Sequence, residues 1–382
     1  MTRFTPGAVA RRRPLAVVLA AVAVVALAAV ALVRAGFGQA SAADQTPQYL
    51  PKSSHVFVIN LENKGYDETW GPASQAPYLS QTLRSQGALL NSYYGTGHNS
   101  LDNYVSQISG QGPNPQTQGD CQVYSPFAQT GTAPQGQAVG NGCVYPNGVT
   151  TVADQLTAAG KTWKGYMEDM GTPCRHPQLG AADDTQKARV GDQYAARHNP
   201  FVYFQSITGS PACAANDVDL SALRGDLASA STTPSLSYIT PNLCHDGHDS
   251  PCVDGEPGGL VSADAWLKTW IPTITNSPAF KQDGVLVITF DESDGPQQDA
   301  GACCGEGPGP NSPLPGITGL GGGRVGALVL SPFTAGGTWS TTPYNHYSLL
   351  ASIEDLFGLP YLGYAGTPGL NRFGLDVYNK GV

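Results

Sequence analysis

The chain has 382 residues, a formal net charge of -9 and only 13% charged residues. Its length suits one large α/β domain or two ordinary ones. An acidic chain without a run of Lys and Arg beyond residue 42 is a poor partner for phosphate backbones, so we expect no nucleic-acid partner.

The first 42 residues have the composition of an export signal. Arg11, Arg12 and Arg13 precede an aliphatic run over residues 15–33, and small residues at 40–42 offer a cleavage site. Cleavage would remove five arginines and no acidic residue, which takes the net charge from -9 to -14. We therefore predict residues 1–42 to be a signal peptide of a secreted or cell-envelope protein. A retained N-terminal anchor is the alternative, and membrane contact is expected only in that case.

Two buried-looking strands each end in a pair of polar residues. The apolar runs over residues 55–61 and 285–290 are typical of central strands in a parallel sheet. Glu62-Asn63 follows the first and Asp291-Glu292 follows the second. Either pair alone reads as a turn or a helix cap, but the carboxyl ends of parallel strands are where ligands bind. We predict that these four residues hold one divalent metal ion, with Mg²⁺, Ca²⁺ or Mn²⁺ favoured over Zn²⁺ because the ligands are oxygens.

A polar segment, Gly97 to Tyr104, begins the helix expected at residues 101–109. Ser100 stands at the N-cap position, and capping is the ordinary function of such a serine. The same position would place its hydroxyl beside free backbone N–H groups that can hold a phosphate. We predict Ser100 as a metal-activated nucleophile, His98 as an acid or charge stabiliser and Asn103 as a donor to a phosphoryl oxygen.

Eight cysteines in an exported chain indicate disulfides rather than metal thiolates. Cys121 with Cys143 and Cys244 with Cys252 would each close a short loop rich in turn residues. Cys303 and Cys304 either bridge each other or pair with Cys174 and Cys213. The absence of a Cys-x-x-Cys pair from the sequence argues against structural zinc.

The segment after the strand expected at 236–240 concentrates polar side chains in eight positions. A disulfide loop could have this composition without any function, but the segment again follows a strand end. We predict His248 as a catalytic histidine and the following residues as substrate contacts: Asn242, His245, Asp246 and Asp249. His346, near the start of the last helix, is a weaker candidate.

Strand-like and helix-like segments alternate from residue 55 to residue 357. This alternation predicts a doubly wound, mostly parallel sheet with helices on both faces, in one domain over residues 43–382 with long loops. We expect strands at residues 55–61, 88–94, 162–167, 236–240, 285–290 and 325–330, and helices at residues 77–87, 101–109, 152–159, 218–230, 263–274 and 344–357.

At these residues the chain resembles the phosphoesterase family of bacterial and fungal acid phosphatases and phosphatidylcholine-type phospholipases C, in the alkaline phosphatase-like superfamily. The resemblance spans roughly residues 53–360. It implies an alkaline phosphatase-like fold and matches the four metal ligands and His98. In the polar block it matches Asn242, Asp246, His248 and Asp249. Ser100 and Asn103 fall where related phosphodiesterases carry a nucleophile and a phosphate-binding Asn. Relatives often have Pro at the positions of Asn99 and Asp102.

We therefore expect an exported, metal-dependent phosphoric ester hydrolase that acts on a small phosphate ester through a phosphoserine. Phosphomonoesterase activity is the first expectation, since the chain lacks an obvious lipid-binding patch. A phospholipase C or other phosphodiesterase, with a phospholipid head group as substrate, is the alternative enzyme. The alternative from another class is an inactive envelope binding module that keeps the fold.

Overall fold

The apolar runs over residues 55–61 and 285–290 form adjacent central strands of the sheet. The computed structural model describes residues 49–381, and the predicted signal peptide lies outside the described residues. Strand β1 (His55–Leu61) pairs in parallel with β9 (Gly284–Phe290), and Leu61 lies opposite Phe290. Every residue of both strands is buried, as expected where helices cover both faces of a sheet. The register therefore places the residues that follow, Glu62 and Asp291, at the same edge of the sheet.

The central sheet has eight strands, of which only β10 runs against the rest. The doubly wound, mostly parallel sheet predicted from the sequence is confirmed. From edge to edge its strands are β11 (Thr338–Ser340), β2 (Ala88–Leu90), β10 (Ala327–Leu330), β9, β1, β8 (Leu236–Thr240), β6 (Trp163–Met167) and β7 (Asp217–Asp219). Two small sheets pair β3 (Tyr93–Tyr94) with β12 (Tyr344–Asn345) and β4 (Ala128–Ala133) with β5 (Gln137–Asn141).

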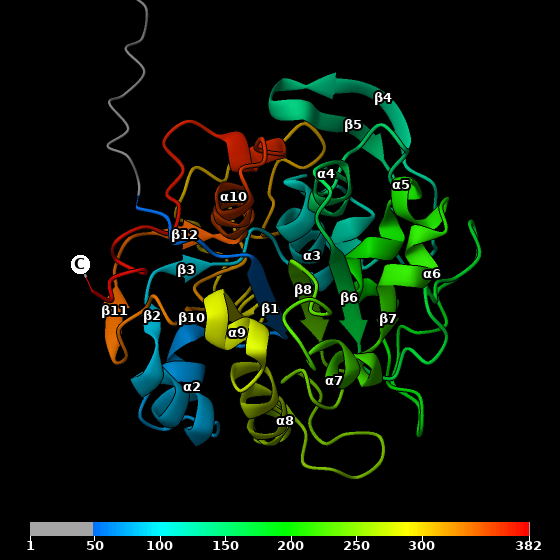
Figure 1. The fold of residues 1–382 in the computed structure, drawn as a ribbon. Helices are drawn as coiled ribbons and strands as arrows, with labels where there is room; N and C mark the ends of the chain where they lie inside the picture. The colour runs from blue at the N-terminus through cyan, green and yellow to red at the C-terminus, as the bar shows by residue number, and fades with distance from the viewer. Residues whose placement is uncertain (1–48, 382) are drawn as a thin grey trace, which may run out of the picture. The chain divides into compact units, whose positions relative to one another are not determined.

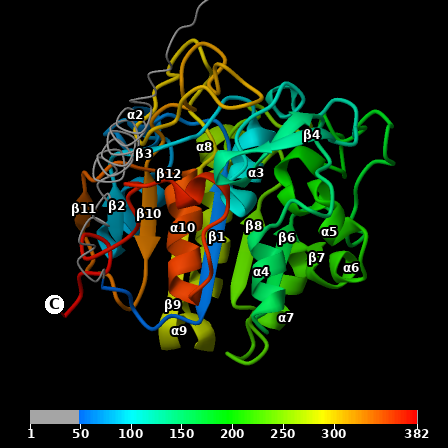
Figure 2. The same ribbon diagram turned by 90° about the horizontal axis from the view of Figure 1, so that it is seen from above.

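Helices cover both faces of the sheet. Figure 1 shows α3, α4 and α10 on one face and α2 and α8 on the other, and in Figure 2 α10 and α4 lie along the strands. The helices are α2 (Tyr66–Trp70), α3 (Ser100–Ser109), α4 (Val152–Ala158), α5 (Gln205–Thr208), α6 (Ala212–Asn216), α7 (Leu223–Asp226), α8 (Gly259–Thr275), α9 (Pro278–Asp283) and α10 (His346–Phe357). All ten residues of α3 are buried, so its side chains contact the sheet and the surrounding loops together.

Several expected elements have different boundaries or types. Residues 77–87 form a π-helical turn and a 3₁₀ turn instead of an α-helix. Residues 88–94 divide between β2 and β3, which belong to different sheets. The helix expected at 218–230 is wrong for its first half, because Val218 pairs with β6 as an edge strand and Asp219 caps the turn that follows.

All eight cysteines form disulfides: Cys121–Cys143, Cys174–Cys213, Cys244–Cys252 and the adjacent pair Cys303–Cys304. The two pairs proposed from loop composition are confirmed, and the open choice at Cys303 is decided in favour of a bridge to Cys304. Between residues 49 and 381, none of the helices combines the length and apolar character needed to cross a bilayer.

Candidate active site

The ends of β1 and β9 bring together the four predicted metal ligands. The Asn63 backbone N–H donates to Asp291 Oδ1 at 3.0 Å, and Asn63 Nδ2 donates to Glu292 Oε1 at 2.9 Å. The backbone N–H of Glu292 also donates to Asp291 Oδ1, at 2.7 Å. Glu62, Asp291 and Glu292 are all buried. One parallel strand pair thus fixes two acidic turns against each other.

Helix α3 delivers a hydroxyl group to this cluster. Ser100 Oγ donates to Glu62 Oε2 at 2.7 Å, and Tyr104 OH donates to Glu62 Oε1 at 2.5 Å. Ser100 and Tyr104 lie four positions apart, on the same face of the helix. Ser100 is the first residue of α3 and not its cap, because Asn99 occupies the cap position with φ of 71°. The N-cap assignment is therefore wrong, and the serine hydroxyl is directed at a carboxylate.

The residues present fit a bound divalent cation. Asn63 Oδ1 and Asp291 Oδ2 are buried and accept no hydrogen bond from the residues of the described chain. Burial raises the pKa of Asp291 to about 6. Burial, followed by repulsion from Asp291, raises the pKa of both Glu62 and Glu292 well above the usual range. Crowded buried carboxylates with free oxygens are the donor set that a hard cation takes, and its charge would relieve their repulsion.

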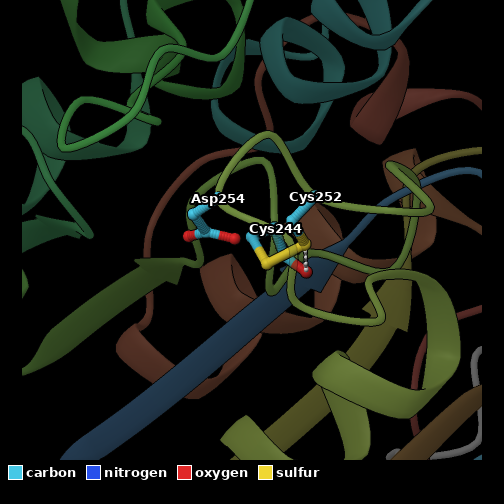
Figure 3. Close-up of side chains that lie close together, drawn as sticks. All are labelled: Cys244, Cys252 and Asp254. Atoms are coloured by element: carbon cyan, nitrogen blue, oxygen red, sulfur yellow. Dashed lines mark hydrogen bonds between the residues drawn. A yellow bond between two sulfur atoms is a disulfide. The ribbon is translucent and has the colours of Figure 1, made fainter.

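Away from this site, the described residues contain tighter groups of metal-binding side chains, but each of these groups includes a disulfide-bonded cysteine. Within residues 49–381, the groups of three or more ligand atoms within 4.8 Å are Cys244–Cys252–Asp254, Cys244–His245–Glu256 and Cys303–Cys304–Glu306. Figure 3 shows the Cys244–Cys252 bond with Asp254 beside it. A sulfur in a disulfide is no thiolate ligand. In the described residues, the carboxylates of the β1–β9 edge do not form such a close group by themselves.

His98 lies behind Glu292. Its Nε2 is 2.8 Å from the Asp299 carbonyl oxygen, and its Nδ1 is 2.8 Å from Glu292 Oε2. A carbonyl only accepts, so Nε2 carries a proton, while Nδ1 lies beside Glu292 Oε2 without a hydrogen bond to it. Burial lowers the pKa of His98, although the Asp299 carbonyl and nearby acids oppose this. In this conformation the ring orients Glu292 and is closed to solvent.

Asn103 is committed to the loop that precedes α3. Its Oδ1 accepts from the backbone N–H groups of Thr96 and Gly97 at 2.8 and 3.0 Å, and its Nδ2 donates to Gly97 O at 3.0 Å. The structure thus engages both ends of the amide that we expected to contact a phosphoryl oxygen. Its contribution here is to position the loop that carries His98 and Ser100.

The backbone N–H groups at the start of α3 are also less available to a phosphate than the sequence suggested. The backbone N–H of Leu101 donates to Asp120 Oδ1 at 3.0 Å, so a carboxylate of the protein occupies the position expected for phosphate. Asp120 immediately precedes Cys121, which is bonded to Cys143. Because sequence spacing places Asp120 nineteen residues beyond Leu101, no local pattern indicates this contact.

His198 belongs to the site but was not among the predicted residues. Its ring stacks on Tyr104 at 5.3 Å with an interplanar angle of 7°. Nε2 lies 3.4 Å from Glu62 Oε2, and Nδ1 lies 3.7 Å from Asp246 Oδ2. Burial, followed by the charges of Arg197 and His248, lowers the pKa of His198 well below its usual value. The only sequence signal was that His198 falls within residues 53–360, over which the chain resembles the family.

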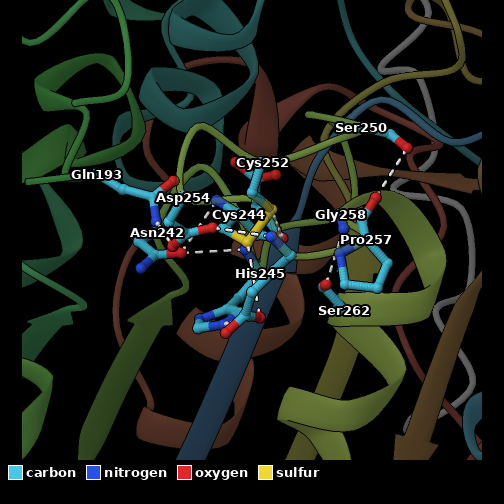
Figure 4. Close-up of a disulfide and its surroundings, with 12 residues drawn as sticks. Gln193, Asn242, Cys244, His245, Ser250, Cys252, Asp254, Pro257, Gly258 and Ser262 are labelled. Carbon is cyan, nitrogen blue, oxygen red and sulfur yellow. Dashed lines mark hydrogen bonds and ion pairs between the residues drawn. A yellow bond between two sulfur atoms is a disulfide. The ribbon is translucent and has the colours of Figure 1, made fainter. Parts of the chain in front are cut away.

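The polar block after β8 divides into two groups. Asp246 is buried beside His198, and its Oδ1 accepts from the His248 backbone N–H at 2.9 Å. Asn242 instead shapes the loop, since its Oδ1 accepts from the backbone N–H groups of Cys244 and His245. Figure 4 shows Asn242, Cys244 and His245 around the Cys244–Cys252 disulfide.

The outer members of the block lie further from the cluster. The His245 ring is bound to Glu168 at 3.0 Å and lies 3.7 Å from Glu256. His248 and Asp249 face each other at 3.2 Å with side chains 49% and 37% exposed.

His346 is fully buried and bonds the Asp291 carbonyl oxygen at 2.6 Å, so it supports the turn at the end of β9.

The fold and this cluster define an α/β protein with an acidic, serine-bearing site at the carboxyl edge of its sheet. The Phosphoesterase family model matches residues 72–360, and the chain belongs to that family. The predicted family membership is thereby confirmed.

Relatives with assigned names are similar at a low level of identity. An acid phosphatase of Aspergillus fumigatus is 27% identical over 330 residues, which is 85% of this chain and 60% of the relative. A phosphatidylinositol-3-phosphatase of Mycobacterium tuberculosis is 25% identical, over 94% of this chain and 95% of the relative. A hemolytic phospholipase C of Pseudomonas aeruginosa is 26% identical, over 59% and 32%. The chain thus spans about 60% of the length of the fungal acid phosphatase.

Among solved structures, a protein of the alkaline phosphatase superfamily from Vibrio parahaemolyticus aligns with a TM-score of 0.46. The alignment covers 84% of this chain and 72% of that one, at 12% identity.

Proposed function

We propose that the protein is an exported, metal-dependent phosphomonoesterase with Ser100 as its nucleophile. The observation that carries this proposal is the 2.7 Å hydrogen bond from Ser100 Oγ to Glu62 Oε2, inside a cluster of buried carboxylates. A reactive serine needs an acceptor for its proton and a fixed direction, and Glu62 supplies both. Membership of the Phosphoesterase family supports the same reaction class.

The residues of the cluster bind the cation or position the nucleophile in the proposed reaction, and Glu62 does both. Glu62, Asn63, Asp291 and Glu292 would hold the cation, which when bound lowers the pKa of a hydroxyl group and offsets phosphoryl charge. Tyr104 OH donates to Oε1 of Glu62, and His198 Nε2 lies 3.4 Å from Oε2, so the acceptor of the serine proton is held on one side and packed on the other. Ser100 Oγ attacks phosphorus in line with the leaving oxygen, and a phosphoserine forms as the ester bond breaks.

The half-exposed His248 is the proposed donor to the leaving oxygen. It lies at the solvent side of Asp246, whereas His98 and His198 are closed to solvent. A group that exchanges protons with water during turnover must reach solvent, and His248 does so. Water then attacks the phosphoserine and releases inorganic phosphate, which restores Ser100.

Export and disulfide formation are proposed together. Four disulfides join all eight cysteines, which is the pattern of an oxidising compartment. The acid phosphatase and phosphatidylinositol-3-phosphatase relatives favour a monoester substrate. A phosphodiesterase is the second candidate, because the phospholipase C relatives share the same family segment.

Turnover of three esters tests the proposal. We expect metal-dependent phosphate release from p-nitrophenyl phosphate, with slower cleavage of bis-p-nitrophenyl phosphate and of phosphatidylcholine vesicles. Ser100→Ala should abolish turnover and also the phosphorylated peptide that mass spectrometry detects after acid quenching. Cleavage of the choline lipid alone would select the phosphodiesterase. An inert protein that still binds inorganic phosphate would be a binding module.

A further inference from the structure

A cavity of about 390 Å³ opens beside the cluster. Its volume is within the range of small-molecule sites. Two loops form it, one before Arg197 and one around the Cys244–Cys252 disulfide, and neither Lys187 nor Arg197 has a role in the function proposed above. The lining includes Lys187, Arg197, Leu243, His248, Asp249 and Val253.

Arg197 connects this cavity to the nucleophile. Asp120 Oδ1 accepts from the Leu101 backbone N–H at 3.0 Å, while Asp120 Oδ2 lies 3.9 Å from Arg197 Nε. One carboxylate therefore separates the guanidinium from the first turn of α3, where Ser100 lies. The next residue, His198, reaches Glu62 Oε2 at 3.4 Å.

Two cations, Arg197 and Lys187, and one carboxylate, Asp249, line the cavity. Arg197 is a fixed cation with a side chain only 11% exposed, and Lys187 is exposed at the rim. Arg197 Nη1 donates to the Gln186 carbonyl at 3.2 Å, and the 3.9 Å contact with Asp120 is too long for a hydrogen bond. A guanidinium has five N–H donors, so several remain for a ligand. The acidic group of the lining, Asp249, lies against His248 at 3.2 Å.

We propose that this cavity binds a second anionic group, a phosphate or carboxylate carried by the leaving group of the phosphoester, through Arg197 and Lys187. This inference rests on the proposed function. Arginine binds planar or tetrahedral oxyanions through paired N–H groups, and a partly buried guanidinium does so with less competition from water. The same charges disfavour a choline head group, because they would repel its trimethylammonium cation.

Two matched substrates isolate the charge of the leaving group. 4-Carboxyphenyl phosphate and 4-carbamoylphenyl phosphate have the same shape and differ by one negative charge. We expect the wild type to show a kcat/KM ratio, carboxy over carbamoyl, of about 10, as one charge-assisted contact implies. Arg197→Gln should lower the ratio to about 1, with most of the change in KM. Lys187→Gln should lower it about threefold, since an exposed pair contributes less.

Lys281→Gln is the matched control, because this exposed lysine lies on α9, before the amino end of β9. It makes the same charge change and should leave the ratio at the wild-type value. A wild-type ratio of 1 or below overturns the inference, as does a high ratio that survives both Arg197→Gln and Lys187→Gln. If Arg197→Gln fails to fold, Lys187→Gln decides alone. If neither ester is hydrolysed by the wild type, the proposed function has failed and the inference falls with it.

Discussion

The carboxyl ends of β1 and β9 and the loop that follows β8 all leave the same edge of the sheet, yet they deliver polar residues differently. At β1 and β9, every polar residue of Glu62-Asn63 and Asp291-Glu292 joins one buried cluster. After β8, only Asp246 reaches that cluster, while Asn242 and His245 bind their own loop and Glu168. The register of the sheet brings the residues that follow the adjacent strands β1 and β9 together, whereas the residues after β8 follow the path of the loop closed by the Cys244–Cys252 disulfide, so their distance from the strand end does not decide which of them reaches the cluster.

The largest loss of activity should come from substitution of Asp291, in the turn that follows β9. We expect Asp291→Ala to lower kcat/KM for p-nitrophenyl phosphate on the order of 10³-fold, because it removes one unpartnered oxygen and the acceptor that holds both neighbouring turns. Asp291→Asn keeps an acceptor at Oδ1 without the charge, so a similar loss would show that charge matters. Circular dichroism would show whether both variants fold. Full activity in both would show that the edge is structural only.

Metal removal tests the same edge without a substitution. Dialysis against a chelator should lower activity about 100-fold or more, and Mg²⁺, Ca²⁺ or Mn²⁺ should restore it. Because a cation would relieve repulsion among buried carboxylates, its addition should also raise the melting temperature by a few degrees. The melting temperature of Asp291→Ala should respond less. An unchanged melting temperature and activity after chelation would contradict the metal assignment.

A lone buried carboxylate offers a contrast to the grouped ones. Burial raises the pKa of Asp217 to about 7, opposed by the hydrogen bond from Asn199 Nδ2. A raised folded-state pKa means that its contribution to stability is complete below the unfolded pKa near 3.8 and is lost as pH rises towards 7. Between pH 4 and pH 8, the free energy of unfolding of Asp217→Asn should therefore rise relative to that of the wild type by on the order of 2 to 4 kcal/mol.

Urea unfolding at these two pH values measures that gain as a difference between variant and wild type. Asp184→Asn, the same substitution at an exposed side chain, is the matched control. A pH-independent difference for Asp217→Asn would show that its carboxyl group is ionised in the folded protein throughout this range.

Asp246 tests whether the loop after β8 contributes to the cluster. Its Oδ2 lies 3.7 Å from His198 Nδ1 and its Oδ1 fixes the His248 backbone. Asp246→Asn should lower kcat about 10- to 100-fold, as expected for a residue that orients others. The measurement is kcat per folded molecule, because a purely structural defect would lower the folded fraction and leave kcat per folded molecule unchanged.

The sequence predicts the strand-end residues well and the loop residues poorly, for a physical reason. Unbroken apolar runs identify β1 and β9, and parallel pairing then brings Glu62 and Asp291 to one edge. His198 and Asp120 reach the site from irregular segments whose paths depend on disulfides and on packing against α3. No periodicity encodes such a path, so their roles become visible only in three dimensions.

His245 should show the smallest effect and would complete the contrast between the two regions. Its ring is bound to Glu168 at 3.0 Å, outside the cluster, although its sequence neighbour Asp246 is buried within it. We expect His245→Ala to change kcat/KM less than threefold, as for other partly exposed ion pairs. A loss as large as that of Asp246→Asn would mean that the loop after β8 moves during turnover and presents His245 to the substrate. In that case the register of the sheet would no longer separate the catalytic residues from the structural ones.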